Sequence, residues 1–359
     1  MKIAEIRTAE IDIPLRTPFK TALRTVESVH DVLIQVTSDT GEKGYGEAPP
    51  TAVITGETIG SIRTAVDEII APTLTGMEIE NLDGIMNRLE KCMVKNTSAK
   101  AAVDMAVYDL YSKACGKPLY QLLGGAKKEL ETDITISVNP VEEMVRDSLE
   151  AVSRGFRILK VKVGKGDQTD VERMKAIRAA VGKDIVLRVD ANQGWEAKQA
   201  VRLIRAMEDA LVAPELVEQP VKAHDLDGMR LITASVETPV LADESLFSAK
   251  DALTLLQTHA ADLLNIKLMK TGGIWQALKI CSIAEIYGVE CMLGCMLESK
   301  LAVSAAVHLA AGRSIVTRAD LDGPALCRVD PYPGGPVYDG PRITLNDTPG
   351  IGVDAGFAF

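Results

Sequence analysis

Two neighbouring stretches, FRILKVKVG (156–164) and DIVLRVD (184–190), establish the pattern of the fold. Each is a short apolar run that carries charged residues toward its end, and an amphipathic segment separates the two. The pattern extends over residues 132–322, where six further runs are expected to be strands: 132–138, 216–220, 239–244, 262–268, 289–294 and 315–322. Repeated strand–helix units predict a parallel sheet. Eight strands in about 190 residues predict an α/β protein with a (β/α)7β-type TIM barrel.

The ends of these strands are evenly spaced and almost all polar. Consecutive ends lie 24–28 residues apart, at Lys162, Asp190, Glu218, Asp243, Lys267, Gly294 and Asp320. An open doubly wound sheet is the alternative, but such a sheet normally has a glycine-rich turn after its first strand, and TISVNP (135–140) has none. In a barrel all strand ends meet at one face, where such enzymes carry out their chemistry, so the spacing also predicts where an active site lies.

The first hundred residues are of a different type. Strands are expected at 3–13, 29–37 and 44–47, and helices at 57–71, 79–94 and 98–115. We therefore expect residues 1–130 to form an α+β capping domain and residues 131–322 to form the barrel. The segment 323–359 is rich in glycine and proline, and we expect it to return to the capping domain.

Composition excludes several classes of protein. The 359 residues carry 40 Lys+Arg against 50 Asp+Glu, a net charge of -10, which argues against a nucleic-acid partner. Apolar residues make up 47%, which excludes disorder, and aromatic residues only 4%, so the core must be aliphatic. No apolar run reaches about 18 residues and the N-terminus lacks a signal peptide, so no membrane partner is expected. Six cysteines without a CxxC pair indicate reduced thiols in a cytoplasmic protein, and we expect a homo-oligomer because such barrels often associate.

Three carboxylates follow three consecutive strands, Asp190, Glu218 and Asp243. Brought together at one face they would repel one another strongly, and a divalent cation would relieve this repulsion. Ligands that are all oxygen favour Mg2+, with Mn2+ possible, over zinc. The alternative is that each residue caps the helix that follows it.

Lysines flank these acids on both sides. Lys160 and Lys162 point to the same face of their strand, and two such close ammonium groups should lower each other's pKa, which suits a general base. Lys267 lies across the barrel, so two lysines can reach opposite faces of one substrate carbon, one removing a proton and the other returning it. The alternative for each lysine is a solvated surface charge, but these lysines interrupt apolar strands.

Asp320 and Asp322 form a D-x-D pair on the last strand. Since three other carboxylates already account for a metal, this pair suits a cationic group of the substrate. A salt bridge to Arg318 or Arg313 explains the pair equally well from the residues alone.

The motifs, taken in order, resemble a known family. K-V-K (160–162), D-A-N (190–192), V-E-Q-P (217–220), A-D-E-S (242–245) and N-I-K-L-M-K (265–270), with the segment 98–125, resemble the muconate-lactonizing subgroup of the enolase superfamily. Within that subgroup, TALRT (21–25), GEAPPTAVITGET (46–58), GCMLES (294–299) and the D-x-D pair resemble the dipeptide epimerases.

The resemblance implies a Mg2+-dependent isomerase that inverts the α-carbon of the C-terminal residue of a dipeptide resembling L-Ala-L/D-Glu, as in peptidoglycan peptide metabolism. It implies that Asp190, Glu218 and Asp243 hold the metal, that Lys160 stabilises the enolate, and that Lys162 and Lys267 are the two bases. It further implies the following contacts: Asp320 and Asp322 to the α-ammonium group, Arg24 to an acidic side chain, Thr135, Cys295 and Met296 to the rest of the substrate, and Asn192 and Glu244 to the metal ligands.

Other reactions remain open. A muconate cycloisomerase or an o-succinylbenzoate synthase would use the same metal and lysines, but their substrates have no ammonium group for the D-x-D pair. An aldolase that forms a Schiff base with a barrel lysine needs no metal. A barrel that only binds a partner would leave the aligned acids and lysines unexplained.

Overall fold

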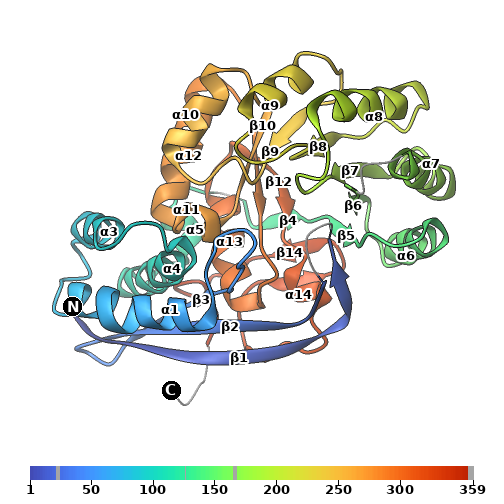
Figure 1. Cartoon of the computed structure of the whole chain (residues 1–359). Helices are drawn as coiled ribbons and strands as arrows, with labels where there is room; N and C mark the ends of the chain where they lie inside the picture. Colours follow the sequence, from blue (N-terminus) through green and yellow to red (C-terminus); the bar gives the residue numbers. More distant parts are fainter. Residues whose placement is uncertain (22–24, 126, 165–167, 355–359) are drawn as a thin grey trace.

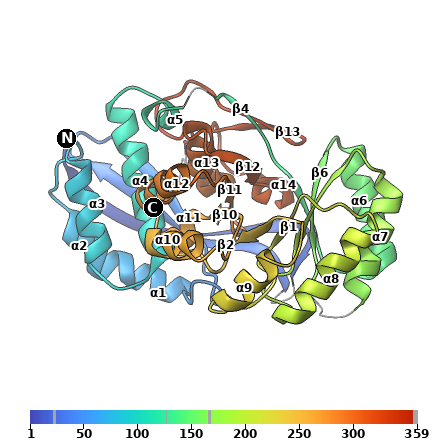
Figure 2. The ribbon, with the colours of Figure 1, turned by 90° about the horizontal axis from the view of Figure 1, so that it is seen from above.

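The computed structural model describes residues 1–21, 25–125, 127–164 and 168–354. The chain forms a barrel and a cap that covers one side of it (Figure 1). Seen from above, the cap helices lie on one side of the molecule, and α6 (Val141–Ser153), α7 (Thr169–Val181) and α8 (Ala197–Asp209) lie on the other (Figure 2).

The barrel is a parallel eight-stranded sheet whose strands follow one another in chain order. All eight strands expected between residues 132 and 322 are present: β5 (Ile134–Ile136), β6 (Ile158–Lys162), β7 (Val186–Asp190), β8 (Leu216–Glu218), β9 (Val240–Ala242), β10 (Leu263–Ile266), β11 (Cys291–Gly294) and β12 (Val316–Asp320). The first and last strands approach each other where the Asp133 N–H donates to the carbonyl of Ala319 at 3.3 Å, so the barrel is nearly closed.

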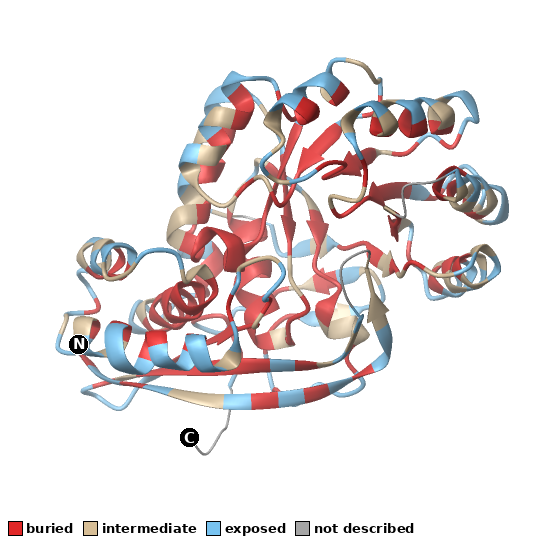
Figure 3. Ribbon diagram, in the orientation of Figure 1, coloured by how far each residue is buried: buried red, intermediate tan, exposed pale blue. Residues whose placement is uncertain are grey.

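Helices follow the barrel strands. They are α6 (Val141–Ser153), α7 (Thr169–Val181), α8 (Ala197–Asp209), α9 (Leu226–Thr233), α10 (Ala249–Gln257), α11 (Leu268–Thr271), α12 (Ile274–Tyr287), α13 (Lys300–Gly312) and α14 (Gly323–Leu326). The strands are mostly buried, and helices such as α8 and α10 expose their outer faces, whereas α13 is buried from Leu301 to Gly312 (Figure 3). This is the (β/α) architecture that the spacing of the strand ends predicted.

The cap begins with three antiparallel strands, β1 (Ile3–Lys20), β2 (Thr25–Ser38) and β3 (Lys43–Ala48). Its helices are α1 (Ile59–Thr64), the π-helical turn η1 (Ala65–Ile70), α2 (Ala71–Leu74), α3 (Leu82–Lys91), α4 (Thr97–Ala114) and α5 (Leu119–Leu122). Helix α4 packs closely on β3, because a Cβ added at Gly46 would lie 1.9 Å from the carbonyl oxygen of Ala102. Glycine at this position allows the helix to approach the sheet.

The last part of the chain runs back to the cap. Cys327 forms a β-bridge with Leu15, and the Ile351 N–H donates to the buried carboxylate of Asp109 on α4 at 2.8 Å. Two strands of this segment, β13 (Val337–Asp339) and β14 (Arg342–Thr344), form an antiparallel sheet with β4 (Glu129–Glu131).

The core is aliphatic, as the low aromatic content predicted. A large cluster of buried residues fills the space between strands and helices and continues into the cap. A small separate cluster contains one residue from each of four neighbouring strands, β8 to β11, and lies inside the barrel. Its members are Leu216, Leu241, Leu263 and Met292. None of the helices in the described parts of the chain has the length and apolar character needed to traverse a bilayer.

Candidate active site

Polar side chains gather at the carboxyl ends of the barrel strands. In the parallel register Lys162 lies beside Asp190, and Asp190 beside Glu218. Asp243 follows β9 directly and Lys267 follows β10. All five residues are buried, with exposed fractions of at most 7%. Charged groups so deeply buried must be paired or must bind an ion.

Lys160 is the centre of the first half of this cluster. Its Nζ lies 2.6 Å from Asp320 Oδ2, 2.8 Å from Glu218 Oε2 and 3.2 Å from Asp190 Oδ2. Lys162 Nζ lies 2.6 Å from the same Asp190 oxygen. One carboxylate oxygen therefore faces two ammonium groups, and one ammonium group faces three carboxylates.

The second half is built around Asp243. Lys267 Nζ lies 2.7 Å from its Oδ2, and Lys270 Nζ lies 2.5 Å from its Oδ1. Lys270 also donates to the backbone carbonyls of Asp243 and Asn265. The sequence interpretation gave Lys270 no role, although it belongs to the quoted motif N-I-K-L-M-K. Asn265 was also missed, and its amide donates to Glu218 Oε1 at 2.8 Å.

The expected lowering of the Lys160 pKa is wrong. Burial by itself lowers it, but the charges of Asp320, Glu218 and Asp190 outweigh burial and hold the pKa well above its usual value. Lys267 behaves in the same way, because Asp243 opposes the effect of burial and raises its pKa. Carboxylates, rather than neighbouring ammonium groups, dominate the surroundings of both lysines.

Some of the acids bind protons more tightly than usual. Burial, reinforced by Asp190, raises the pKa of Glu218 to about 8, and burial with Asp243 raises that of Glu244 to about 7. The pKa of Asp243 stays well below its usual value, since Lys267 and Lys270 outweigh burial. Burial is the larger cause for Glu218 and Glu244, and the neighbouring carboxylates add to it.

The D-x-D pair belongs to the same cluster. Asp320 pairs with Lys160, and Asp322 Oδ2 accepts a hydrogen bond of 2.7 Å from the Thr135 backbone N–H. Burial opposes ionisation of Asp320, but Lys160 and Lys267 lower its pKa to about 2. Burial and the charge of Asp320 raise the pKa of Asp322 to about 6.

The alternative pairings do not form. Arg318 pairs with Glu215 and Glu290, and Arg313 pairs with Glu285, so neither arginine neutralises the D-x-D pair. The three expected metal ligands do not cap helices either. The N-caps of the helices that follow them are Glu196, Asp225 and Ser248.

The donor set fits a hard divalent cation. Asp190, Glu218 and Asp243 supply only carboxylate oxygens. The buried Asn192 Oδ1 and Glu244 Oε2 beside them have no hydrogen-bond partner among the residues that the structure describes. Asn192 and Glu244 contact each other at 3.3 Å, and the Asn192 N–H donates to Asp190 Oδ1. In residues 1–21, 25–125, 127–164 and 168–354, no three His, Cys, Asp or Glu side chains are grouped closely enough to hold an ion. The ammonium groups of Lys160, Lys162 and Lys267 contact the carboxylates instead.

A cavity of about 660 Å3, part of it open to solvent, reaches this cluster. Lys160, Lys162, Lys267, Asp320 and Asp322 line its floor, together with the expected residues Thr135, Cys295 and Met296. The expected residues Asn192, Asp243 and Glu244 line it as well. The sequence interpretation gave no role to the rest of the lining: Phe19, Thr21, Thr51, Val53 and Ile54 from the cap, Leu297, and Leu326 from α14. Arg24 lies outside the described residues.

Comparisons with known proteins agree with this geometry. The family model described as "Enolase C-terminal domain-like" matches residues 143–356, and "Mandelate racemase / muconate lactonizing enzyme, N-terminal domain" matches residues 3–124. The chain belongs to the enolase superfamily. The expected family and fold are thereby confirmed.

Several relatives resemble this enolase-superfamily chain over nearly its whole length. The L-Ala-D/L-Glu epimerase of Clostridium acetobutylicum is 53% identical over 99% of both chains. The substrate-liganded structure of the L-Ala-D/L-Glu epimerase from Bacillus subtilis superposes with a TM-score of 0.97, at 48% identity, covering 98% of this chain and 99% of that one. The dipeptide epimerase from Enterococcus faecalis, complexed with Mg and L-Leu-L-Tyr, gives a TM-score of 0.95 at 42% identity over 98% and 99% of the two chains.

Proposed function

We propose that this chain is a Mg2+-dependent dipeptide epimerase that inverts the α-carbon of the C-terminal residue of its substrate. One observation carries the proposal: Lys162 and Lys267 lie on strands four apart in an eight-stranded barrel and face the same cluster of carboxylates. They therefore approach a substrate held in that cluster from opposite sides. Relatives that share half of the sequence over its full length are dipeptide epimerases.

The metal ion is assigned to three carboxylates. Asp190, Glu218 and Asp243 would hold Mg2+. Asn192 would orient Asp190 through its backbone N–H, and Glu244 would act through its contact with the Asn192 amide. When bound, Mg2+ supplies positive charge that attracts the substrate carboxylate and stabilises the negative charge that develops on it as the α-proton leaves. Lys160 lies among the same carboxylates and would donate a hydrogen bond to that developing charge.

The two bases exchange roles with the direction of reaction. One of Lys162 and Lys267, in its neutral form, accepts the α-proton at its Nζ. The other, in its protonated form, returns a proton from its Nζ to the opposite face of the same carbon. The configuration at that carbon is thereby inverted.

Substrate binding uses the last strand. Asp320 and Asp322 would hold the α-ammonium group of the dipeptide, while Thr135, Cys295 and Met296 line the remaining space. Arg24 is proposed to bind an acidic side chain, which would favour a substrate resembling L-Ala-L/D-Glu. Such a substrate would place the enzyme in peptidoglycan peptide metabolism.

The proposal extends to organisation and location. The contacts of Cys327 and Ile351 with the cap support a capping domain made from residues 1–130 and 323–359, with the barrel at 131–322. The six free cysteines support a cytoplasmic location. A homo-oligomer remains an expectation based on how often such barrels associate.

A Schiff-base aldolase fits the site less well. A Schiff base forms without a metal, so this reaction would give no role to the neighbouring carboxylates of Asp190, Glu218 and Asp243. Burial lowers the pKa of Lys270, but this side chain is fully buried and is not part of the cavity wall. Trapping of a substrate adduct by borohydride would favour the aldolase.

The direct test is a screen of L,L and L,D dipeptides in deuterated water with Mg2+ present, with α-proton exchange followed by NMR. We expect exchange at the C-terminal α-carbon together with inversion. The variant Asp322→Asn should raise KM for dipeptides, because it removes a charge facing the ammonium group. Absence of exchange with every dipeptide would exclude the epimerase.

A further inference from the structure

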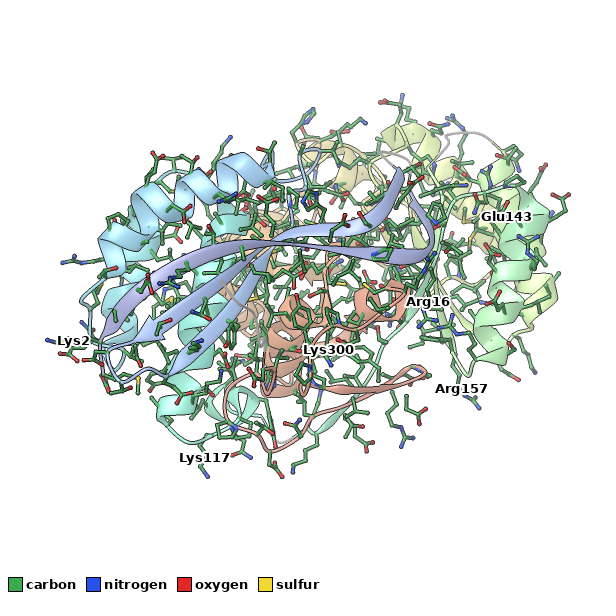
Figure 4. All side chains as sticks on the ribbon, turned by 90° about the horizontal axis from the view of Figure 1, so that it is seen from below. Lys2, Arg16, Lys117, Glu143, Arg157 and Lys300 are labelled. Atoms are coloured by element: carbon green, nitrogen blue, oxygen red, sulfur yellow. The ribbon has the colours of Figure 1, made fainter. Side chains whose placement is uncertain are left out.

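A second cavity lies next to the active site. Its volume is about 1120 Å3, part of it open to solvent, and its walls come from β1, β5, α6 and α14. Arg16 on β1 and Glu143 on α6 both line it, and Figure 4 shows them at this end of the molecule, beside the bend of the cap strands. Nothing in the proposed reaction uses this space.

Among the described residues, three lie between the two cavities. Phe19, Thr135 and Leu326 line both of them, and each is half-buried. They come from the cap, from the first barrel strand and from the short helix after the last strand. We call these three residues the partition.

The partition is attached to the proposed ammonium site. Asp322 accepts a hydrogen bond from the Thr135 N–H at 2.7 Å, and its backbone carbonyl accepts one from the Leu326 N–H at 3.3 Å. Two of the three partition residues are therefore held by Asp322 itself. Their positions relative to a bound ammonium group are fixed by the fold.

The covalent structure of a dipeptide determines which part of the substrate contacts the partition. In the N-terminal residue, the α-carbon is one bond, about 1.5 Å, from the ammonium nitrogen. With the ammonium group on Asp320 and Asp322, the side chain of that residue must leave the α-carbon close to Asp322. The partition lies there, and the second cavity lies behind it.

We infer that Phe19, Thr135 and Leu326 limit the size of the N-terminal side chain of the substrate, and that the second cavity can receive a larger apolar side chain once the partition is reduced. Ile136, Ala151 and Ala325 give part of that cavity an apolar lining, and the rest carries charged side chains, those of Arg16, Lys20, Glu143, Arg146, Asp147, Glu150 and Arg154. This inference rests on the proposed function and assigns a determinant of specificity to it.

The test compares two substrates that differ only at the N-terminal residue, L-Ala-L-Glu and L-Leu-L-Glu. The wild-type protein should prefer L-Ala-L-Glu. In Leu326→Ala, the ratio of kcat/KM for L-Leu-L-Glu to that for L-Ala-L-Glu should rise by about tenfold or more, since a few methylene groups in an apolar pocket change selectivity by this much. Leu326→Met is the matched control, because it preserves the volume of the side chain and should leave the ratio within about threefold of wild type.

Phe19→Leu provides a second variant in a different element, should Leu326→Ala not fold. It should shift the ratio in the same direction. The inference is overturned if wild type already uses both dipeptides equally well, or if kcat/KM falls equally for both in a folded variant. Failure of the proposed function looks different, since wild type would then exchange no α-proton in either dipeptide.

Discussion

The interior of the barrel contains two layers of charged side chains, which differ in how their charges are paired. In the lower layer, at the amino ends of the strands, Arg188 donates to Asp133 at 2.8 Å, to Glu215 at 2.6 Å and to the Ala319 carbonyl at 3.1 Å. In the upper layer, two residues further along β7, Asp190 shares one oxygen between two lysines. In the lower layer, the Arg188 guanidinium donates to three different acceptors. In the upper layer, two ammonium groups share one carboxylate oxygen of Asp190.

The difference distinguishes a structural cluster from a functional one. Four lysines of the upper layer (Lys160, Lys162, Lys267 and Lys270) face six carboxyl groups (Asp190, Glu218, Asp243, Glu244, Asp320 and Asp322), a formal excess of two negative charges. The raised pKa values of Glu218, Glu244 and Asp322 follow from burial together with this excess. A divalent cation supplies two positive charges, so the upper layer is balanced when the proposed Mg2+ is bound.

The largest expected effect concerns the upper layer. Removing divalent ions with EDTA should reduce epimerisation by about 10³-fold or more, because charge stabilisation by a metal contributes several kcal/mol. Adding Mg2+ back should restore the rate. Full activity of a metal-free protein, verified by elemental analysis, would contradict the assignment of the carboxylates.

The next effect concerns the lower layer. Arg188→Met leaves the buried Asp133 without its partner and should lower the free energy of unfolding by about 3 kcal/mol, measured by urea denaturation. Arg146→Met is the matched control. The side chain of Arg146 is 69% exposed in its pairs with Glu143 and Asp147, so the change should be within about 1 kcal/mol. Equal losses in both variants would mean that the lower layer is not a stabilising network.

The smallest effect is a pH dependence. As the pH falls through about 6, Asp322 takes up a proton and loses the charge that attracts the substrate ammonium group. The value of kcat/KM should therefore fall by up to about tenfold per pH unit below that point. Asp322→Asn should abolish this inflection, and an unchanged inflection in the variant would assign it to another group.

Sequence reasoning located the upper layer because its residues repeat at the length of one strand–helix unit. Strand alternation placed Lys160 beside Lys162 and Asp320 beside Asp322 on one face, and the parallel register then brought neighbouring strand ends together. Alternation does not say which partner a charge meets. The sequence therefore predicted mutual repulsion for Lys160, where the structure places three carboxylates.

Other parts of the site have no such periodicity. Arg188 interrupts an apolar strand much as Lys160 does, but its partners Asp133 and Glu215 lie on other strands and at strand starts, where no spacing rule applies. Lys270 lies on a single helical turn after β10. Phe19 and Leu326 come from opposite ends of the chain and line the same cavity only because the cap closes over the barrel.

The central claim is that two lysines act on opposite faces of one carbon. It is tested most directly by α-proton exchange in deuterated water with Lys162→Ala and Lys267→Ala, each given both isomers of the C-terminal residue. Each variant should lose about 10²–10⁴-fold in epimerisation and retain exchange with one isomer only, and the retained isomer should differ between the two variants. Exchange of the same isomer by both variants, or of both isomers by either one, would contradict the account.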